Sequence, residues 1–190
     1  MRKCKSRLNN IVSQKHIQQA AAHMKQGGIV AYPTEGVFGL GCDPCNAKTV
    51  KRLLRLKQRP ASKGLILIAS DIEQLKPFIS DIPKKALKTW PGPVTWLLPT
   101  KANTPYWLTG KYDTIAVRIT AHPAAAALCK AFGGAIVSTS ANRSNQNPAL
   151  TDREVRKRFD TSEIFVVPGK VQTPGTVSRI IDARSDKALR

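Results

Sequence analysis

Acidic and aromatic residues are both scarce in this sequence of 190 residues. Only 12 Asp and Glu oppose 31 Lys and Arg, which leaves a formal charge of +19 at neutral pH. A positive surplus of this size predicts that the partners of the protein are polyanions. Phe, Tyr and Trp make up 6% of the chain, which is few for a platform that binds single-stranded nucleic acid by stacking its bases.

Long apolar runs are missing from the sequence as well. No stretch approaches the roughly 18 apolar residues that a membrane-spanning helix needs. The basic opening MRKCKSRLNN is followed by a polar helical pattern and not by the apolar region of a signal peptide. We therefore expect a cytoplasmic protein that has no membrane partner.

Four cysteines are too few for a disulfide scaffold, and a cytoplasmic protein keeps its cysteines reduced. Cys42 and Cys45 form a lone C-x-x-C pair. A zinc site would need a second such pair, or a Cys/His pair at finger spacing, and the sequence has neither. The histidines His16, His23 and His122 are scattered. We therefore expect no metal site in this chain.

The length, with 42% hydrophobic residues, is enough to bury one sizeable core. No repeat, low-complexity tract or linker divides the chain. We expect a single domain over residues 1–190, with residues 1–10 and 185–190 as loose ends. No G-x-x-x-x-G-K-[ST] motif occurs, and GVFGLG (36–41) lacks the Rossmann spacing, so a bound nucleotide must be held by another device.

Hydrophobic periodicity alternates between helix and strand along the chain. A helix follows Ser13, a second helix spans residues 47–57, and GLILIA (64–69) is apolar enough for the middle of a sheet. Two capping boxes, Ser70–Glu73 and Thr151–Glu154, predict the starts of short helices. Further strands are predicted for IVAYPT (29–34), VTWLLP (94–99), IAVRIT (115–120), AIVSTS (135–140) and IFVVPG (164–169). The pattern is that of an α/β domain.

The stretch KQRPASKG (57–64) places cations between the second predicted helix and the buried strand. If the chain is extended through Pro60, Lys57 and Arg59 point to the same side. Together they would form an anion clamp suited to phosphate oxygens. The alternative is a solvated helix end, because cations favour helix C-termini in any protein.

A second polar cluster follows an apolar strand in IVSTSAN (136–142). Ser138, Thr139, Ser140 and Asn142 collect at the strand end, which is where open α/β sheets bind ligands. No general base of the Ser-His-Asp type accompanies them, so we do not expect a nucleophilic serine. The alternative is a turn that is capped by Asn142.

The third candidate is Arg118, which interrupts a face of small residues in the predicted strand IAVRIT. A buried guanidinium needs an anionic partner, because an unpaired buried charge is too costly. That partner is either a structural carboxylate or a ligand. The scarcity of acidic residues favours the ligand.

Five motifs appear in a characteristic order, and the pairing of K-x-R with S-x-N at this separation is the specific part of the pattern. They are YPTEGVFGLGCD (32–43), KQRPASKG (57–64), WPGPVT (90–95), VRITAHP (117–123) and STSAN (138–142). Through them the chain closely resembles the short, single-domain form of the YrdC/TsaC family of threonylcarbamoyl-AMP synthases. The resemblance runs from about residue 15 to residue 182.

The resemblance implies a fold and a reaction. The fold is a twisted, mixed, open α/β sheet with flanking helices around a deep basic cavity. The reaction condenses L-threonine, bicarbonate and ATP, accompanied by Mg²⁺, to threonylcarbamoyl-AMP and pyrophosphate. A downstream tRNA threonylcarbamoyl transferase complex then uses the product to modify the adenosine beside the tRNA anticodon.

The resemblance also implies roles for nine side chains. Lys57 and Arg59 would be the catalytic cations that hold the triphosphate. The other ATP-binding residues would be Thr114, Ser140 and Asn142. The threonine site would consist of Thr34, Arg118, Ser138 and Ser178. Within that site, Arg118 would bind the carboxylate of the amino acid.

Two alternatives stand beside this interpretation. One is a non-catalytic factor that binds double-stranded RNA or tRNA, or that takes part in ribosome maturation, which the charge of +19 favours. The other is a carbamoyl-adenylate site like that of hydrogenase-maturation carbamoyltransferases, but the zinc fingers that accompany those domains are missing from this sequence.

Overall fold

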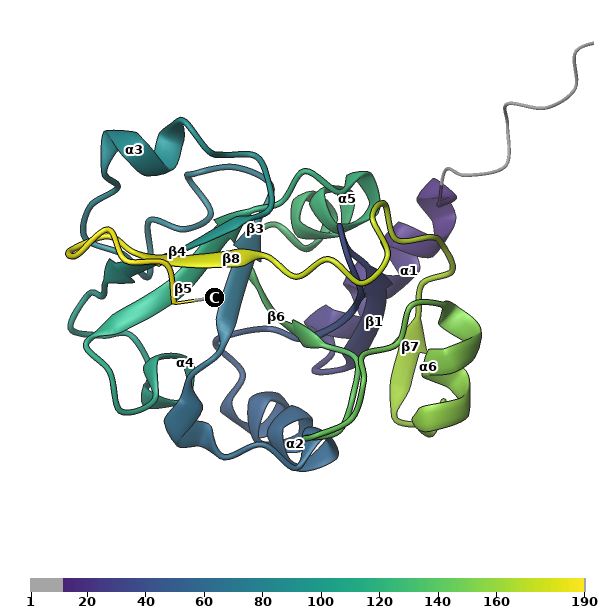
Figure 1. The fold of residues 1–190 in the computed structure, drawn as a ribbon. Helices are drawn as coiled ribbons and strands as arrows, with labels where there is room; N and C mark the ends of the chain where they lie inside the picture. The colour runs from purple at the N-terminus through teal and green to yellow at the C-terminus, as the bar shows by residue number, and fades with distance from the viewer. Residues whose placement is uncertain (1–11, 190) are drawn as a thin grey trace, which may run out of the picture.

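The computed structural model of the chain describes residues 12–189 and consists of one mixed sheet with helices on both faces (Figure 1). The strands are β1 (Ile29–Pro33), β2 (Phe38–Gly41), β3 (Ile66–Ala69), β4 (Val94–Pro99), β5 (Thr114–Ile119), β6 (Ile136–Ser140), β7 (Ile164–Val166) and β8 (Arg179–Asp182). The helices are α1 (Gln14–Lys25), α2 (Ala47–Lys57), α3 (Lys84–Leu87), α4 (Tyr106–Thr109), α5 (Pro123–Phe132) and α6 (Asp152–Arg158), with a 3-10 turn, η1 (Ala61–Lys63).

The eight strands lie in the order β7-β1-β2-β6-β3-β5-β4-β8. Three neighbouring pairs are parallel (β7 with β1, β3 with β5, and β4 with β8), and the other four pairs are antiparallel. The α/β class predicted from the sequence pattern and the mixed open sheet implied by the resemblance are confirmed. The strand β3 lies in the interior of the sheet, as its continuous apolar run predicts.

Two hydrophobic layers cover the sheet. Helices α1 and α5 pack against each other on one face, where Ile68 and Ile136 of the sheet meet Met24 and Leu128 of the helices. The opposite face carries the larger core. It includes the apolar face of α2, which consists of Val50, Leu53 and Leu54. Because side chains alternate along each strand, β1, β3, β6 and β7 contribute to both layers.

Local signals explain where the main helices begin. The side chain of Ser13 accepts a hydrogen bond from the His16 amide at the start of α1, and Asn46 does the same for Thr49 at the start of α2. The capping box at Thr151 is confirmed, because its side chain accepts from the Glu154 amide at the start of α6. All six strands expected from the sequence are present.

The predicted helix at Ser70–Glu73 is wrong. Those residues form turns, in which the Asp71 carboxylate accepts from the Gln74 amide and the Gln74 side chain accepts from the Ser70 amide. The side chains that would cap a helix therefore form hydrogen bonds within the turns instead. The sequence analysis also missed the helices α3, α4 and α5 and two strands, the glycine-rich β2 and the edge strand β8.

The loose ends predicted for the chain are described only in part. Residues 1–10 lie outside the described residues. Near the other end, Ala188 forms a bridge with Ile181, the Leu189 amide donates to the Ile180 carbonyl, and Asp186 forms an ion pair with Lys85. No helix within residues 12–189 combines the length and the apolar character that crossing a membrane requires.

Candidate functional site

A cavity of about 800 Å³ occupies the part of the sheet that α1 and α5 leave uncovered. Ser138 and Ser140 line it and share one side of β6 with Ile136, which packs under the helices. Along β5, Thr114, Ala116 and Arg118 face the cavity, while the alternate residues Ile115 and Val117 belong to the opposite core. The strand period therefore brings the candidate residues of β5 and β6 into one cavity.

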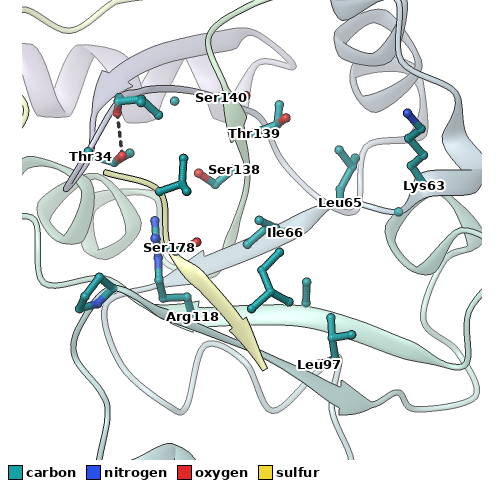
Figure 2. A pocket seen from close by; sticks show the side chains of 18 of the residues that line it. Thr34, Lys63, Leu65, Ile66, Leu97, Arg118, Ser138, Thr139, Ser140 and Ser178 are labelled. Carbon is teal, nitrogen blue, oxygen red and sulfur yellow. Dashed lines mark hydrogen bonds between the residues drawn. The ribbon is translucent and has the colours of Figure 1, made fainter. Parts of the chain in front are cut away.

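The lining of the cavity has a polar side and an apolar side (Figure 2). Thr34, Ser138, Ser178 and Arg118 gather on one side, whereas Leu65, Ile66 and Leu97 lie together on the other. Among the lining residues the cations are Arg59, Lys63 and Arg118, and the acidic residue is Glu35. The cavity is therefore basic, which agrees with the expectation from the sequence.

The turn of residues 34–37 forms one wall of the cavity. It follows β1 directly, and both the amide and the hydroxyl of Thr34 donate to the Val37 carbonyl, at 3.2 and 2.7 Å. These bonds orient the buried Thr34 side chain at the polar side, as Figure 2 shows. Gly39 of β2 then crosses the floor, where a Cβ would lie 3.2 Å from the Thr34 methyl group.

Residues 172–176, here called the cover segment, lie across this turn. The Glu35 carbonyl accepts hydrogen bonds from the amides of Gln172 and Thr173, at 3.0 and 2.7 Å, and the Gly36 carbonyl accepts one from Gly175. A Cβ on Gly36 would lie only 1.5 Å from the Thr176 carbonyl oxygen. The close approach of two backbones therefore requires glycine at position 36.

The Gly36→Ala variant tests this contact. Because the added methyl group must push the cover segment away, we expect a free energy of unfolding lower by about 1–3 kcal/mol. We also expect a loss of whatever ligand binding the cavity performs. Thermal melting and ligand titration measure both effects. Gly134→Ala is the matched control, since its Cβ would meet Phe132 only at 3.8 Å, and equal behaviour of the two variants would contradict the account.

Arg118 is buried and forms an ion pair with Glu35, with 3.2 Å between Nη2 and Oε2. The sequence analysis favoured a ligand as the anionic partner, but the partner within the described residues is this carboxylate. Arg118 still has capacity for a further acceptor, because a guanidinium carries five N–H donors and the ion pair with Glu35 uses Nη2. The guanidinium lines the cavity together with Ser138. A protein carboxylate and a ligand can therefore share this one cation.

Burial acts to raise the pKa of the Glu35 carboxyl, but the Arg118 guanidinium and hydrogen bonds outweigh it, so the pKa lies below its ordinary value. The hydroxyl of Thr120 and the amide of Ala121 donate to Oε1, at 2.8 and 2.9 Å. Glu35 therefore stays ionised at neutral pH, which suits ion pairing better than proton transfer.

Lys57 and Arg59 do not form one clamp along an extended chain. Gln58, between them, caps α2 in the left-handed conformation, so the alternation assumed from the sequence does not apply. Arg59 lines the cavity, and its Nη2 donates to the Gly64 carbonyl at 2.9 Å. Lys57 is buried behind the lining and binds the end of β6.

The ammonium of Lys57 joins the K-x-R and S-x-N motifs. It donates to the carbonyls of Ser140 and Asn142, the latter at 2.7 Å. The hydroxyl of Ser140 in turn donates to the Asn142 side-chain oxygen at 2.6 Å, which orients both groups. Burial, together with the nearby Arg59 charge, lowers the pKa of Lys57 to about 8.

The structure brings most of the candidate residues together. Seven of them line the cavity: Thr34, Arg59, Thr114, Arg118, Ser138, Ser140 and Ser178. Lys57 and Asn142 do not belong to the lining, but they hold Ser140, which does. The hydroxyl of Ser178 accepts a hydrogen bond from Thr95 at 3.1 Å. The sequence analysis missed Glu35.

The lone C-x-x-C pair is separate from this site. Cys42 is buried, and burial raises the pKa of its thiol to about 12, whereas Cys45 is exposed. Within residues 12–189, no three His, Cys, Asp or Glu side chains lie close enough together to hold a metal ion.

Comparison with known proteins gives a consistent result. Residues 22–190 match a family model named Sua5/YciO/YrdC and described as "Telomere recombination". A protein of Halorhodospira halophila named threonylcarbamoyl-AMP synthase is 52% identical over 178 residues, which cover 92% of this chain and 93% of that protein.

Solved structures of similar fold support the same grouping. The P. abyssi Sua5 protein complexed with L-threonine is 34% identical with a TM-score of 0.86, over 94% of this chain. This chain spans about half of that protein, since the match covers 54% of it. E. coli YciO has a TM-score of 0.79 at 24% identity, over 93% of this chain and 88% of that chain, which supports the fold alone.

Proposed function

The chain belongs to the Sua5/YciO/YrdC family, and on that premise we propose that it is a threonylcarbamoyl-AMP synthase. It condenses L-threonine, bicarbonate and ATP to threonylcarbamoyl-AMP, pyrophosphate and water, the water being lost when the amine and bicarbonate form the carbamate. The observation that carries this proposal is the single basic cavity, in which a site for a carboxylate lies near cations and hydroxyls suited to a nucleotide. In the overall reaction, the carbamate oxygen of threonine attacks the α-phosphorus of ATP, and pyrophosphate leaves.

This chemistry suits a cavity without a catalytic histidine. The carbamate is already an anion and pyrophosphate is a good leaving group, so positioning and charge stabilisation matter more than proton transfer. A cavity largely closed to water also protects a mixed anhydride from hydrolysis.

We propose that threonine binds at the polar side of the cavity. The Arg118 guanidinium binds its carboxylate, and Thr34, Ser138 and Ser178 surround the rest of the molecule. A relative, the P. abyssi Sua5 protein, has been solved with L-threonine bound, which supports an amino-acid site in this fold. The position of Arg118 beside three hydroxyls supports the same assignment.

We propose that ATP lies between the threonine site and the apolar lining. Arg59 binds the phosphates, and Ser140 and Thr114 contact the nucleotide. Lys57 and Asn142 act from behind, where the hydrogen bonds from Lys57 hold the end of β6 in place. The apolar side of the cavity offers room for the adenine.

Magnesium is best explained as part of the substrate. The acidic residue that lines the cavity, Glu35, is already paired with Arg118, so the lining offers no oxygen cage for a divalent cation. Mg²⁺ is commonly held by substrate phosphates together with water. We therefore propose that it enters on ATP, where it neutralises part of the triphosphate charge.

The most direct test of the activity omits each substrate in turn. With L-threonine, bicarbonate and MgATP all present, we expect pyrophosphate and threonylcarbamoyl-AMP in equal amounts. Omission of any one substrate should remove both products. Pyrophosphate that forms without threonine or bicarbonate would contradict the proposal.

The affinity for ATP should depend on pH through Lys57. Because burial lowers its pKa to about 8, the ammonium is charged below pH 8 and neutral above it. If binding needs the charge, the affinity falls about tenfold per pH unit above pH 8. The free energy of unfolding should change in the opposite direction and rise with pH. The cost of burying the Lys57 charge is fully present below pH 8 and is relieved as the pH rises toward 10.5.

Equilibrium titration of ATP between pH 6.5 and 9.5, without threonine, measures this dependence. The Lys57→Met variant is the control, because it removes the ionising group. A wild-type affinity that stays constant to pH 9.5 would show that the charge of Lys57 does not contribute.

The remaining partners follow from the chemistry of the product. A reactive adenylate needs an acceptor enzyme, so we propose transient delivery to a tRNA threonylcarbamoyl transferase complex in the cytoplasm. RNA binding is a second candidate function, which the charge of +19 and the exposed cations Lys48, Lys51, Arg52 and Arg55 on α2 favour. RNA affinity that falls steeply with salt, and that survives Lys57→Ala, would separate this activity from catalysis.

A further inference from the structure

We propose that Glu35 is the positioning residue of the threonine site: its side chain holds Arg118, while its backbone carbonyl holds the cover segment. This inference rests on the proposed function, and it concerns a residue outside the nine that the sequence motifs pointed to. The two attachments belong to a single residue of the turn 34–37, so one residue aligns two walls of the cavity.

The side-chain attachment is buried and specific. The exposed fraction of Glu35 is 7% and that of Arg118 is 8%, so water screens their ion pair only weakly. Thr120 and Ala121 hold Oε1, which leaves Oε2 to face the Arg118 guanidinium at 3.2 Å. The carboxylate therefore fixes where the guanidinium lies on the cavity wall.

The arrangement leaves Arg118 able to bind a second anion. The ion pair with Glu35 uses Nη2 of Arg118, and the guanidinium also lines the cavity. A guanidinium has five N–H donors, so it can bind Glu35 and the threonine carboxylate at the same time. Because Oε2 is buried, Glu35 acts on the substrate through Arg118 and not by contact.

The backbone attachment reaches the cover segment. The Glu35 carbonyl accepts from the Thr173 hydroxyl at 3.2 Å, in addition to the amides of Gln172 and Thr173. Thr173, Thr176 and Ser178 all line the cavity. A shift of Glu35 therefore displaces the cover segment as well as Arg118.

This geometry predicts a selective effect on threonine. Glu35→Gln keeps the size of the side chain but removes the charge, so Arg118 loses the group that aligns it. The usual strength of a hydrogen bond to a charged group corresponds to a loss of about 10- to 150-fold in threonine affinity. This loss should appear as a higher KM for threonine. The KM for ATP should stay within about twofold, since Arg59 and Ser140 are held by other contacts.

Comparing the binding of two ligands, L-threonine and L-threoninamide, distinguishes loss of Arg118 positioning from general damage to the cavity. Wild-type protein should bind L-threonine more tightly than L-threoninamide, which lacks the negative charge that Arg118 recognises. In Glu35→Gln this preference should shrink at least about tenfold, because the loss falls on carboxylate recognition. A general loosening of the cavity would weaken both ligands equally and leave the ratio unchanged.

Two further variants keep the test decisive. Thr120→Val removes one hydrogen bond to Glu35 but keeps its charge, so it should produce a smaller change in the same direction. If Glu35→Gln does not fold, Glu35→Asp is measured in the same way, since the carboxylate is then one methylene farther from Arg118. An unchanged ligand ratio in the folded variant overturns the inference.

The failure of this inference is distinguishable from failure of the proposed function. If wild-type protein forms no threonylcarbamoyl-AMP from the three substrates, the function is wrong. If wild-type protein is active and Glu35→Gln keeps its threonine preference and KM, only the role of Glu35 is wrong.

Discussion

Replacement of Lys57 by alanine is expected to lower threonylcarbamoyl-AMP formation by about 10²- to 10³-fold, the usual effect of removing one preorganised donor from a site where charge develops. The variant loses a buried cation and also the bonds that hold the carbonyls of Ser140 and Asn142. Both losses fall on the nucleotide, so kcat and ATP affinity should decline together. Pyrophosphate release under saturating threonine measures the effect.

Arg55→Ala is the matched control for this variant. Arg55 is an exposed cation on the same helix, two residues before Lys57, and it faces away from the cavity lining. Its removal should leave turnover within about twofold, as is usual for surface substitutions. Equal losses of turnover in the two variants would contradict this account. They would mean that turnover depends on the total positive charge of the chain and not on the position of Lys57.

Replacement of Arg118 by methionine should raise the KM for threonine by at least about 100-fold, because two charge-assisted hydrogen bonds to the carboxylate are lost. The KM for ATP should change much less. The variant also leaves Glu35 as a buried unpaired carboxylate, so the free energy of unfolding should fall by about 3–5 kcal/mol. Steady-state kinetics and chemical denaturation measure the two effects.

A double variant separates the two roles of Arg118. Glu35→Gln combined with Arg118→Met removes both charges, so most of the lost stability should return. Threonine binding should not return, because the cation that recognises the carboxylate is still missing. Recovery of threonine binding together with stability would assign Arg118 a purely structural role.

The sequence was a good guide wherever a strand pattern placed polar residues. Along IAVRIT and AIVSTS the period of two predicts one face with Arg118 and another with Ser138 and Ser140, and both faces meet in the cavity. The pairing of K-x-R with S-x-N is also realised, because Lys57 binds the carbonyls of Ser140 and Asn142. The strand faces depend on regular geometry, which a sequence encodes locally, whereas the pairing of the two motifs was implied by the resemblance to the family.

What the sequence could not predict depends on irregular backbone and on distant contacts. The left-handed conformation of Gln58 sends Lys57 and Arg59 to different partners, and no local signal marks it. Glu35 meets Arg118 across 83 positions of the chain, and although it lies in the motif YPTEGVFGLGCD (32–43), no local pattern marks it as the partner of Arg118. The need of a buried arginine for an anion was the signal that would have justified a search among the 12 acidic residues.

The strands missed in the sequence have similar causes. In FGLG, two glycines weaken the strand pattern, although a Cβ on Gly41 would lie 2.3 Å from the Val137 carbonyl of the neighbouring strand. The run RIID of β8 is half exposed at the sheet edge, so its period is weak. A strand whose residues are chosen for the cavity or the edge loses the hydrophobic alternation that identifies strands.

The central claim is that threonine and ATP bind in the same cavity, threonine beside Arg118 and the ATP phosphates beside Arg59. A crystal structure with L-threonine and a non-hydrolysable ATP analogue tests it most directly. The account predicts the threonine carboxylate within hydrogen-bond distance of Arg118, and the phosphates beside Arg59 and the end of β6. A nucleotide bound outside the cavity, for example on the exposed cations of α2, would contradict it.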